Sequence, residues 1–293
     1  MNPPRPISPS REHPLDYLLI GHVTRDVVPG GFMLGGTVSY SAMAAAALGL
    51  RVGIITAAPH SLDLSPLDSF PILRIPCADA TTFENIETPQ GRIQYLHQRA
   101  PTLTAAMIPS DWLQAAIIHF APVADEISPS LVDLYADRFL CITPQGCLRA
   151  IDNQKRVRYC DWPDAGQILP RMQAAAISAE DVQFDEKRIQ YLQQRIPILA
   201  VTEGENGARV YWNNDMRHFP APKVPLVDTT GSGDVFAAVF FAHLFATRDA
   251  WAAGEQAVKL ASLSVTRRGI TGMPTPEEVQ AATAEIPTRK FTA

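Results

Sequence analysis

Eight consecutive residues combine side-chain types and a spacing that could act on an anion. Residues 227–234 read V-D-T-T-G-S-G-D, and almost all of residues 235–245 are apolar. Two glycines separated by one small residue let backbone N–H groups converge without a side chain between them. The apolar stretch predicts a buried helix whose free N–H groups and dipole add to this positive end. The sequence therefore predicts an anion site, such as a phosphate site, after a strand at residues 224–227.

Asp234 is the unusual member of this motif, because a carboxylate repels an anion that stays in place. It can instead take the proton from a hydroxyl group that attacks a phosphorus atom, and phosphoryl transfer needs little more than positioning, donors and such a base. The amides of Gly231, Ser232 and Gly233 would then surround the transferred group. The alternative is an ordinary strand–turn–helix junction, since short glycine motifs alone are weak evidence.

Composition bounds the class of protein. The chain has 293 residues, 46% hydrophobic and 19% charged, which is ordinary for a globular protein with a sizeable core. The net charge is −5 without a basic block, so nucleic acid is an unexpected partner. Four cysteines without a C-x-x-C pair favour reduced thiols and a cytoplasmic location. No apolar run approaches a membrane span, so no membrane association is expected.

Elements in the first third of the chain must position the remaining polar residues. The apolar run at residues 17–21 predicts a buried strand, and Asp26 follows it at the edge where ligands gather in open α/β sheets. Gly35 and Gly36 stand just before an alanine-rich helix that ends near Gly49. A further strand at residues 51–57 completes a β–α–β unit with parallel strands.

The middle of the chain mixes buried strands with hairpins. Strands predicted at residues 116–123 and 139–146 bring Glu126 and Gln145 to strand ends, where they could line a cleft. A helix is expected between them, at residues 128–138. Alternating patterns predict hairpins within residues 81–98, 148–159 and 208–219, and a last helix at residues 250–268.

The motif at residues 228–234 resembles the C-terminal signature of the ribokinase-like (PfkB) carbohydrate kinases, D-T-x-G-A-G-D. G-G-T-V-S-Y at residues 35–40, before the alanine-rich helix, is similar to the family's N-terminal G-G-x-x-x-N-x-A. The resemblance implies one α/β domain over residues 1–293, a three-layer sandwich with a mainly parallel sheet and a small β lid. Residues 1–15 would form a loose tail, and about 24–35 and 72–104 would contribute the lid.

The resemblance also assigns roles by position. Asp234 would be the catalytic base. The acceptor would meet Asp26, Gly35, Gly36, Ser39, Tyr40, Phe83, Asn85, Tyr95, Glu126 and Gln145. The nucleotide would meet Thr202, Gly204, Gly207, Ser262, Arg267 and Gly269. Metal ions would lie near Glu180, Asp181, Asp228 and Thr230.

Three positions depart from the family pattern. Tyr40 stands where the family's sugar-binding asparagine is usual, Ser178 and Asp181 replace the ends of N-x-x-E, and Ser262 replaces an asparagine near the adenine. The expected reaction is transfer of the γ-phosphoryl group of ATP, with Mg²⁺ and K⁺ as candidate ions, to a hydroxyl of a sugar, an inositol-like polyol or a nucleoside. A dedicated nucleoside kinase and a non-catalytic binding protein that kept the fold remain open, and family members often pair through the lid as homodimers.

Overall fold

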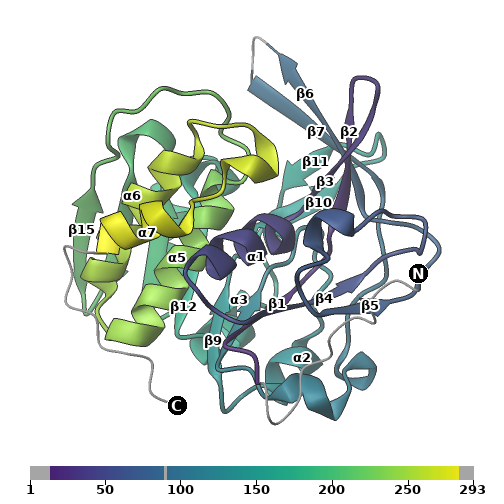
Figure 1. Cartoon of the computed structure of the whole chain (residues 1–293), viewed down its shortest axis with the longest axis horizontal. Helices are drawn as coiled ribbons and strands as arrows, with labels where there is room; N and C mark the ends of the chain where they lie inside the picture. Colours follow the sequence, from purple (N-terminus) through teal and green to yellow (C-terminus); the bar gives the residue numbers. More distant parts are fainter. Residues whose placement is uncertain (1–13, 89–90, 284–293) are drawn as a thin grey trace.

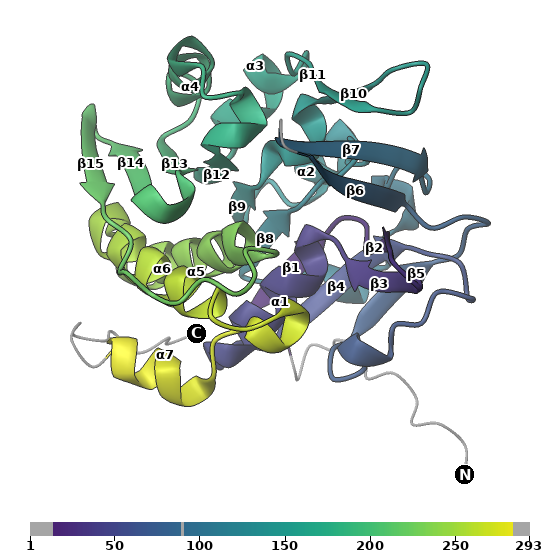
Figure 2. The same cartoon turned by 90° about the horizontal axis from the view of Figure 1, so that it is seen from above.

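The computed structural model describes residues 14–88 and 91–283. The expected tail at residues 1–15 therefore lies almost wholly outside the described residues, as do the hairpin positions 89 and 90. The described chain forms three layers, with helices on both faces of a large sheet and a small sheet standing over one edge (Figures 1 and 2). The expected α/β architecture with a mainly parallel sheet and a small lid is confirmed.

The large sheet has nine strands, and all its pairs are parallel except those of its last two strands. In sheet order they are β15 (Asp215–Phe219), β14 (Ala208–Trp212), β13 (Ile198–Thr202), β12 (Ala174–Ser178), β9 (Phe139–Ile142), β8 (Ile117–Phe120), β1 (Tyr17–Ile20), β4 (Val52–Ala57) and β5 (Ile72–Ile75). β1 and its neighbours are buried on both faces, which is why their sequences are continuous apolar runs.

Two hydrophobic cores cover the two faces of this sheet. One face packs against α1 (Thr37–Ala47), α5 (Ser232–Thr247), α6 (Ala250–Ser264) and α7 (Pro276–Thr283). The other face packs against α2 (Pro129–Leu134), α3 (Ala165–Ile168) and α4 (Glu186–Gln193). Figure 2 shows the two helix layers on opposite sides of the strands. Among the described residues, no helix is long and apolar enough to cross a membrane.

The lid is a second, four-stranded sheet in the order β3-β2-β6-β7. Its strands are β2 (Thr24–Val28), β3 (Gly31–Gly35), β6 (Thr82–Thr88) and β7 (Gly91–Gln98), and β2 pairs with β6 in parallel. A third pair, β10 (Arg149–Ile151) with β11 (Val157–Tyr159), lies against β7 through a hydrogen bond from the Leu96 N–H to the Lys155 carbonyl. The hairpin expected within residues 208–219 is formed by β14 and β15. It turns through Asn213 and Asn214, whose backbones are both in the left-handed conformation.

Several predicted element boundaries are wrong. The helix predicted as the last one, at residues 250–268, ends at Ser264 and is followed by α7. Residues 224–227 form no strand, because the N–H groups of Val227 and Asp228 both donate to the Val265 carbonyl at the end of α6, and the segment is largely exposed. Residues 72–75 join the large sheet as β5, beside β4, and not the lid. The helix expected at residues 128–138 covers only α2, since the chain turns at Tyr135 and Arg138 before β9 begins.

α5 joins the large sheet to the helices on the same face, because its side chains fill the core between them. Phe236, Phe240 and Phe241 are almost fully buried in it, and the Phe241 ring meets His119 of β8 edge-on at 5.0 Å between centroids. The helix is apolar on every side, as its sequence indicated.

We expect Phe240→Ala to lower the free energy of unfolding by about 3–5 kcal/mol, because it leaves a cavity in a closely packed core. The measurement is urea denaturation followed by circular dichroism. Phe184→Ala is the matched control, since Phe184 is 68% exposed and should change stability by less than about 0.5 kcal/mol. Equal effects of the two substitutions would contradict the assigned position of α5 in the core.

Candidate active site

The N-terminus of α5 is the centre of the candidate site. Gly231 occupies the N-cap position with φ 80°, and no side chain caps this end of the helix. The Ser232 N–H donates to the Thr229 carbonyl at 3.2 Å, and the helix dipole adds partial positive charge to the N–H groups of the first turn. Asp228 fixes the preceding turn, because its Oδ1 accepts a hydrogen bond from the Thr230 N–H at 2.9 Å.

Tyr40 of α1 packs directly against this turn. A Cβ atom on Gly231 would lie 2.3 Å from the Tyr40 ring, so only glycine fits there, both for its left-handed φ and for the contact. Tyr40 is 4% exposed, and burial raises the pKa of its hydroxyl above its ordinary range, with Asp234, Asp26 and Asp228 adding to the effect. The residue that departs from the family pattern thus forms a wall between the acceptor side and the turn.

Asp234 lines a small cavity of about 70 Å³ at this helix end. Burial, together with the charges of Asp181 and Asp26, raises the pKa of its carboxyl to about 7. A hydrogen bond from the Thr37 side chain and the charge of Arg149 act in the opposite direction. A carboxyl with a pKa near 7 can both accept and release a proton close to neutral pH.

The acceptor side is built around Asp26 on β2. Its Oδ1 accepts a hydrogen bond from the Thr24 hydroxyl at 2.8 Å, and burial raises its pKa. A Cβ on Gly35 would lie 2.3 Å from Oδ2, so the glycine permits the close approach of backbone and carboxylate. Gly36 is left-handed, with φ 89°, and packs on the His22 carbonyl. The Ser39 hydroxyl donates to the Gly35 carbonyl at 2.7 Å, so it supports this turn from behind.

Gln145 and Asp181 meet on the opposite wall of the Asp234 cavity. The Gln145 side-chain amide donates to Asp181 Oδ1 at 2.9 Å, and the Ser178 N–H donates to Oδ2 at 2.9 Å. Ser178 and Asp181 form a capping box for the short helix after β12. Glu180 points away, with its side chain 67% exposed and 3.9 Å from Arg92, so it does not line this cavity.

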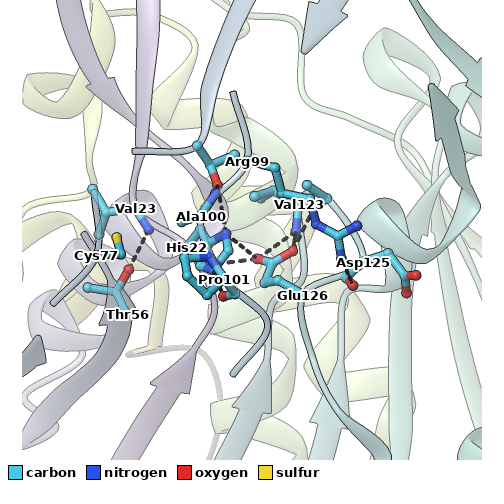
Figure 3. Close-up of polar contacts among 12 residues, drawn as sticks. His22, Val23, Thr56, Cys77, Arg99, Ala100, Pro101, Val123, Asp125 and Glu126 are labelled. Carbon is cyan, nitrogen blue, oxygen red and sulfur yellow. Dashed lines mark hydrogen bonds and ion pairs between the residues drawn. The ribbon is translucent and has the colours of Figure 1, made fainter. Parts of the chain in front are cut away.

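Glu126 lies in a closed hydrogen-bond cluster with His22 (Figure 3). It is fully buried, and its two oxygens accept hydrogen bonds from the backbone N–H groups of His22, Val123 and Ala124 at 2.7–3.1 Å. The predicted contact with a ligand is therefore wrong for Glu126. His22 is also fully buried, and the Nε2 of His22 donates a hydrogen bond to the Pro101 carbonyl at 3.0 Å.

The lid residues divide by strand alternation. Phe83 is buried on the inner face, beside Asp26 in the β2–β6 register. Asn85 shares that face but lies exposed nearer the tip, where its Oδ1 accepts from the Gln94 side chain. Tyr95 pairs with Glu84 and stacks on His97, so it lies on the other face, and its predicted ligand contact is wrong because successive strand residues alternate sides.

On the donor side, the end of β13 reaches the cavity through Thr202, whose hydroxyl donates to the Ile177 carbonyl at 3.4 Å. Gly204 follows with φ 58°, at the start of an open turn. Gly207 has another function, because a Cβ there would lie 2.0 Å from the Phe219 carbonyl oxygen. It allows β15 to close onto β14 and contributes to the site only through the shape of this turn.

The remaining predicted donor residues lie around the end of α6. The Gly269 N–H donates to Asp228 Oδ2 at 2.9 Å, so Asp228 ties this loop to the turn before α5, and these backbone bonds lower its pKa against the effect of burial. The Ser262 hydroxyl donates to the Val258 carbonyl of its own helix at 2.8 Å. Arg267 binds Glu278 of α7 with both terminal nitrogens, at 3.0 and 2.9 Å.

Three residues of the site were missed by the sequence analysis: Thr37, Thr143 and Arg149. Thr37 and Thr143 line the Asp234 cavity, and Arg149 reaches it electrostatically from β10. Thr37 follows the two glycines, so its position could have been recognised there. Arg149 carried no signal in the sequence, because its position depends on how the β10–β11 hairpin packs under the lid.

The oxygen donors of the cavity suit Mg²⁺ held through water. Within residues 14–88 and 91–283, no group of three His, Cys, Asp or Glu side chains could hold a metal by itself. Asp181 already accepts two hydrogen bonds, and Mg²⁺ usually keeps several waters and binds substrate phosphates. The residues therefore fit a hydrated ion that arrives with a nucleotide.

Comparison with known proteins agrees with this geometry. The model of the pfkB family carbohydrate kinases matches residues 174–277. A cytidine kinase of Thermococcus kodakarensis is 28% identical over 266 residues, which cover 78% of this chain and 88% of that protein. A pyrophosphate-dependent kinase of the ribokinase family, complexed with a pyrophosphate analogue and myo-inositol, superposes with a TM-score of 0.78, at 19% identity over 90% of this chain and 99% of its own. A putative ribokinase II from E. coli in complex with ATP and Mg²⁺ has a TM-score of 0.69, at 18% identity over 92% of this chain and 99% of its own.

The fold and site define a phosphotransferase that uses an alcohol group as acceptor. The resemblance to the ribokinase-like (PfkB) family is confirmed, because the pfkB family model matches residues 174–277 and the cytidine kinase matches most of the chain.

The raised pKa of Asp234 predicts a pH-dependent stability difference. The folded protein binds this proton up to about pH 7 and the unfolded chain only to about pH 4, so the unfolding free energy falls as pH rises between these values. Asp234→Asn removes this loss, and we expect its stability relative to the parent to rise by roughly 2–3 kcal/mol between pH 4.5 and pH 8. Asp137→Asn, at an exposed position, is the control. A difference that does not change with pH would show that the pKa is not raised.

The contact between Gly231 and Tyr40 predicts a coupled pair of substitutions. Gly231→Ala should cost about 1–3 kcal/mol of stability, because alanine meets the Tyr40 ring and resists a φ of 80°. Adding Tyr40→Ala should recover part of that loss, so a double-mutant cycle by urea denaturation should give a coupling of at least about 0.5 kcal/mol. Strict additivity would show that the two residues do not touch.

Proposed function

We propose that this protein transfers the γ-phosphoryl group of ATP to a hydroxyl group of a sugar, an inositol-like polyol or a nucleoside, with Asp234 as the base. The observation that carries the proposal is a carboxyl with a pKa near 7 inside a cavity at an uncapped helix N-terminus. This combination places a proton acceptor beside donors for an anion, which a protein that only binds phosphate would not need.

The acceptor is oriented so that one hydroxyl group faces Asp234. Asp26 accepts hydrogen bonds from its other hydroxyls, and the backbone at Gly35 and Gly36 approaches it closely. Asp234 removes the proton, the hydroxyl oxygen attacks the γ-phosphorus in line, and ADP leaves. The amides of residues 231–234 bind the negative charge of the phosphoryl group as it moves.

The donor phosphates lie between the helix end and Thr202 with Gly204. Mg²⁺ supplies charge neutralisation between the phosphates when it is bound. Asp181, held by Gln145 and Ser178, would bind the water molecules of such an ion. Asp228 joins the turn before α5 to the loop at Gly269, and we assign K⁺, if it is required, to the carbonyl groups beside it.

A phosphoryl donor that has no nucleobase, such as pyrophosphate, is a second candidate for the donor. Ser262 and Arg267, the residues expected near adenine, are engaged by their own helix and by Glu278. The pyrophosphate-dependent structural neighbour makes this a concrete alternative. The acceptor panel is therefore to be run with ATP and with pyrophosphate.

We expect acceptor-dependent turnover with one donor, and a loss of about 10²–10⁴ in kcat for Asp234→Asn, because general-base catalysis contributes roughly this factor. In the parent enzyme kcat/KM should fall about tenfold for each pH unit below about 7, where Asp234 becomes protonated. The measurement is release of ADP or phosphate against pentoses, hexoses, inositols and nucleosides, with Asp137→Asn as control. Donor binding without turnover of any acceptor would favour a non-catalytic binding protein.

A further inference from the structure

A second and larger cavity lies under the lid, outside the Asp234 cavity. Its volume is about 280 Å³, far more than the roughly 30 Å³ that one water occupies in the liquid. Its apolar wall comes from the lid, from the loop after β8 and from β10: Phe83, Leu96, Val123, Ala124 and Ile151. Its polar groups are Arg99, Asp125 and Arg149. Of these residues, only Phe83 was expected at the site.

One row of side chains joins this cavity to the acceptor carboxylate. Asp26 of β2 is paired with Phe83 of β6, and Phe83 is paired with Leu96 of β7. Paired residues on neighbouring strands point to the same face of a sheet and lie about 5 Å apart. A molecule held at Asp26 therefore needs to extend by only about one strand spacing to reach the apolar wall.

Arg149 stands where the two cavities approach each other. One of its nitrogens donates to the Val123 carbonyl at 2.8 Å, and its guanidinium carbon lies 5.3 Å from the centre of the Phe83 ring. Its charge acts on both Asp26 and Asp234. A guanidinium has five N–H donors, so the Val123 carbonyl takes only one of them and the group can also serve a ligand.

The lining distinguishes three kinds of ligand group. A further polyol ring would bring hydroxyls against an apolar wall, where they would lose their hydrogen bonds with water. A phosphate or carboxylate would meet Arg149 and Arg99, but also the carboxylate of Asp125 and the same apolar wall. A flat heteroaromatic ring has apolar faces for Phe83 and Leu96, and edge oxygen or nitrogen atoms for a guanidinium.

We propose that this cavity binds the base of a nucleoside acceptor whose ribose is held at Asp26, with Arg149 donating hydrogen bonds to the edge of the base. The inference rests on the proposed kinase function and narrows its acceptor to nucleosides. Arg149 and Phe83 are then the residues that select the acceptor, and they do not take part in the transfer itself.

Binding can be measured apart from turnover by calorimetry on Asp234→Asn protein. The ligands are cytidine, uridine, adenosine, ribose, ribose 5-phosphate and myo-inositol. We expect at least one nucleoside to bind about 100-fold more tightly than ribose or myo-inositol, because only a nucleoside contacts Asp26 and fills the lid cavity at the same time.

Two variants test the cavity by different means. Arg149→Lys keeps the charge but loses the planar fork, and Ile151→Trp narrows the cavity from its rim, where Ile151 is 43% exposed. Each should weaken nucleoside binding at least tenfold, and Ile151→Trp should leave ribose binding unchanged. Arg158→Lys is the matched control, since Arg158 lies on the same hairpin, 52% exposed and paired with Asp152.

The outcomes separate this inference from the function on which it rests. Tightest binding of myo-inositol, ribose or ribose 5-phosphate, or nucleoside binding unaffected by Ile151→Trp, would overturn the assignment of the cavity. If such an acceptor is then turned over by the parent enzyme and not by Asp234→Asn, the kinase function stands. Nucleoside binding that depends on Arg149, without turnover of any acceptor by the parent, would support the cavity and overturn the kinase.

Discussion

The burial of a carboxylate at the start of α5 is the constraint on which the candidate site depends. α5 is apolar all round, so the core fixes its position and the direction of its N-terminus. Asp234 in its first turn is half-buried and lines the small cavity, and burial raises its pKa. Gly231 and Tyr40 close one side of this helix end, and Thr37 donates to the carboxyl from α1. Core packing and acid–base chemistry are thus two consequences of one helix.

The lid is tied to the sheet at its base by buried polar contacts. The Thr81 hydroxyl lies 2.7 Å from His22 Nδ1 and accepts a hydrogen bond from the Ala100 N–H. The segment that enters β6 and the segment that leaves β7 are therefore both joined to the loop after β1. Glu126 holds that loop from the other side through backbone N–H groups. A buried carboxylate with several such partners is stable without a counter-charge of its own. This cluster keeps Asp26 and Phe83 at fixed positions relative to α5.

On the donor side, hydrogen bonds fix the carboxylate of Asp181 at the Asp234 cavity. Asp181 has a shorter side chain than the glutamate of the family pattern. Gln145, which lies in the turn after β9, donates a hydrogen bond to Asp181 and fixes the orientation of that carboxylate. Ser178 serves as a helix cap in place of the usual asparagine. The carboxylate therefore still faces the cavity that contains Asp234.

Local pattern in the sequence was sufficient for the parts of the protein that repeat over a few residues. The buried strands, the alanine-rich helix, the hairpin through Asn213 and the G-S-G-D turn all follow from hydrophobic period and backbone preference. The tertiary structure alone decided three other features. Tyr95 lies on the outer side of the lid, the oxygens of Glu126 accept hydrogen bonds from backbone N–H groups, and the charge of Arg149 acts on Asp26 and Asp234. These three outcomes depend on strand register and on loops that meet from distant parts of the chain, and neither leaves a trace in the local sequence.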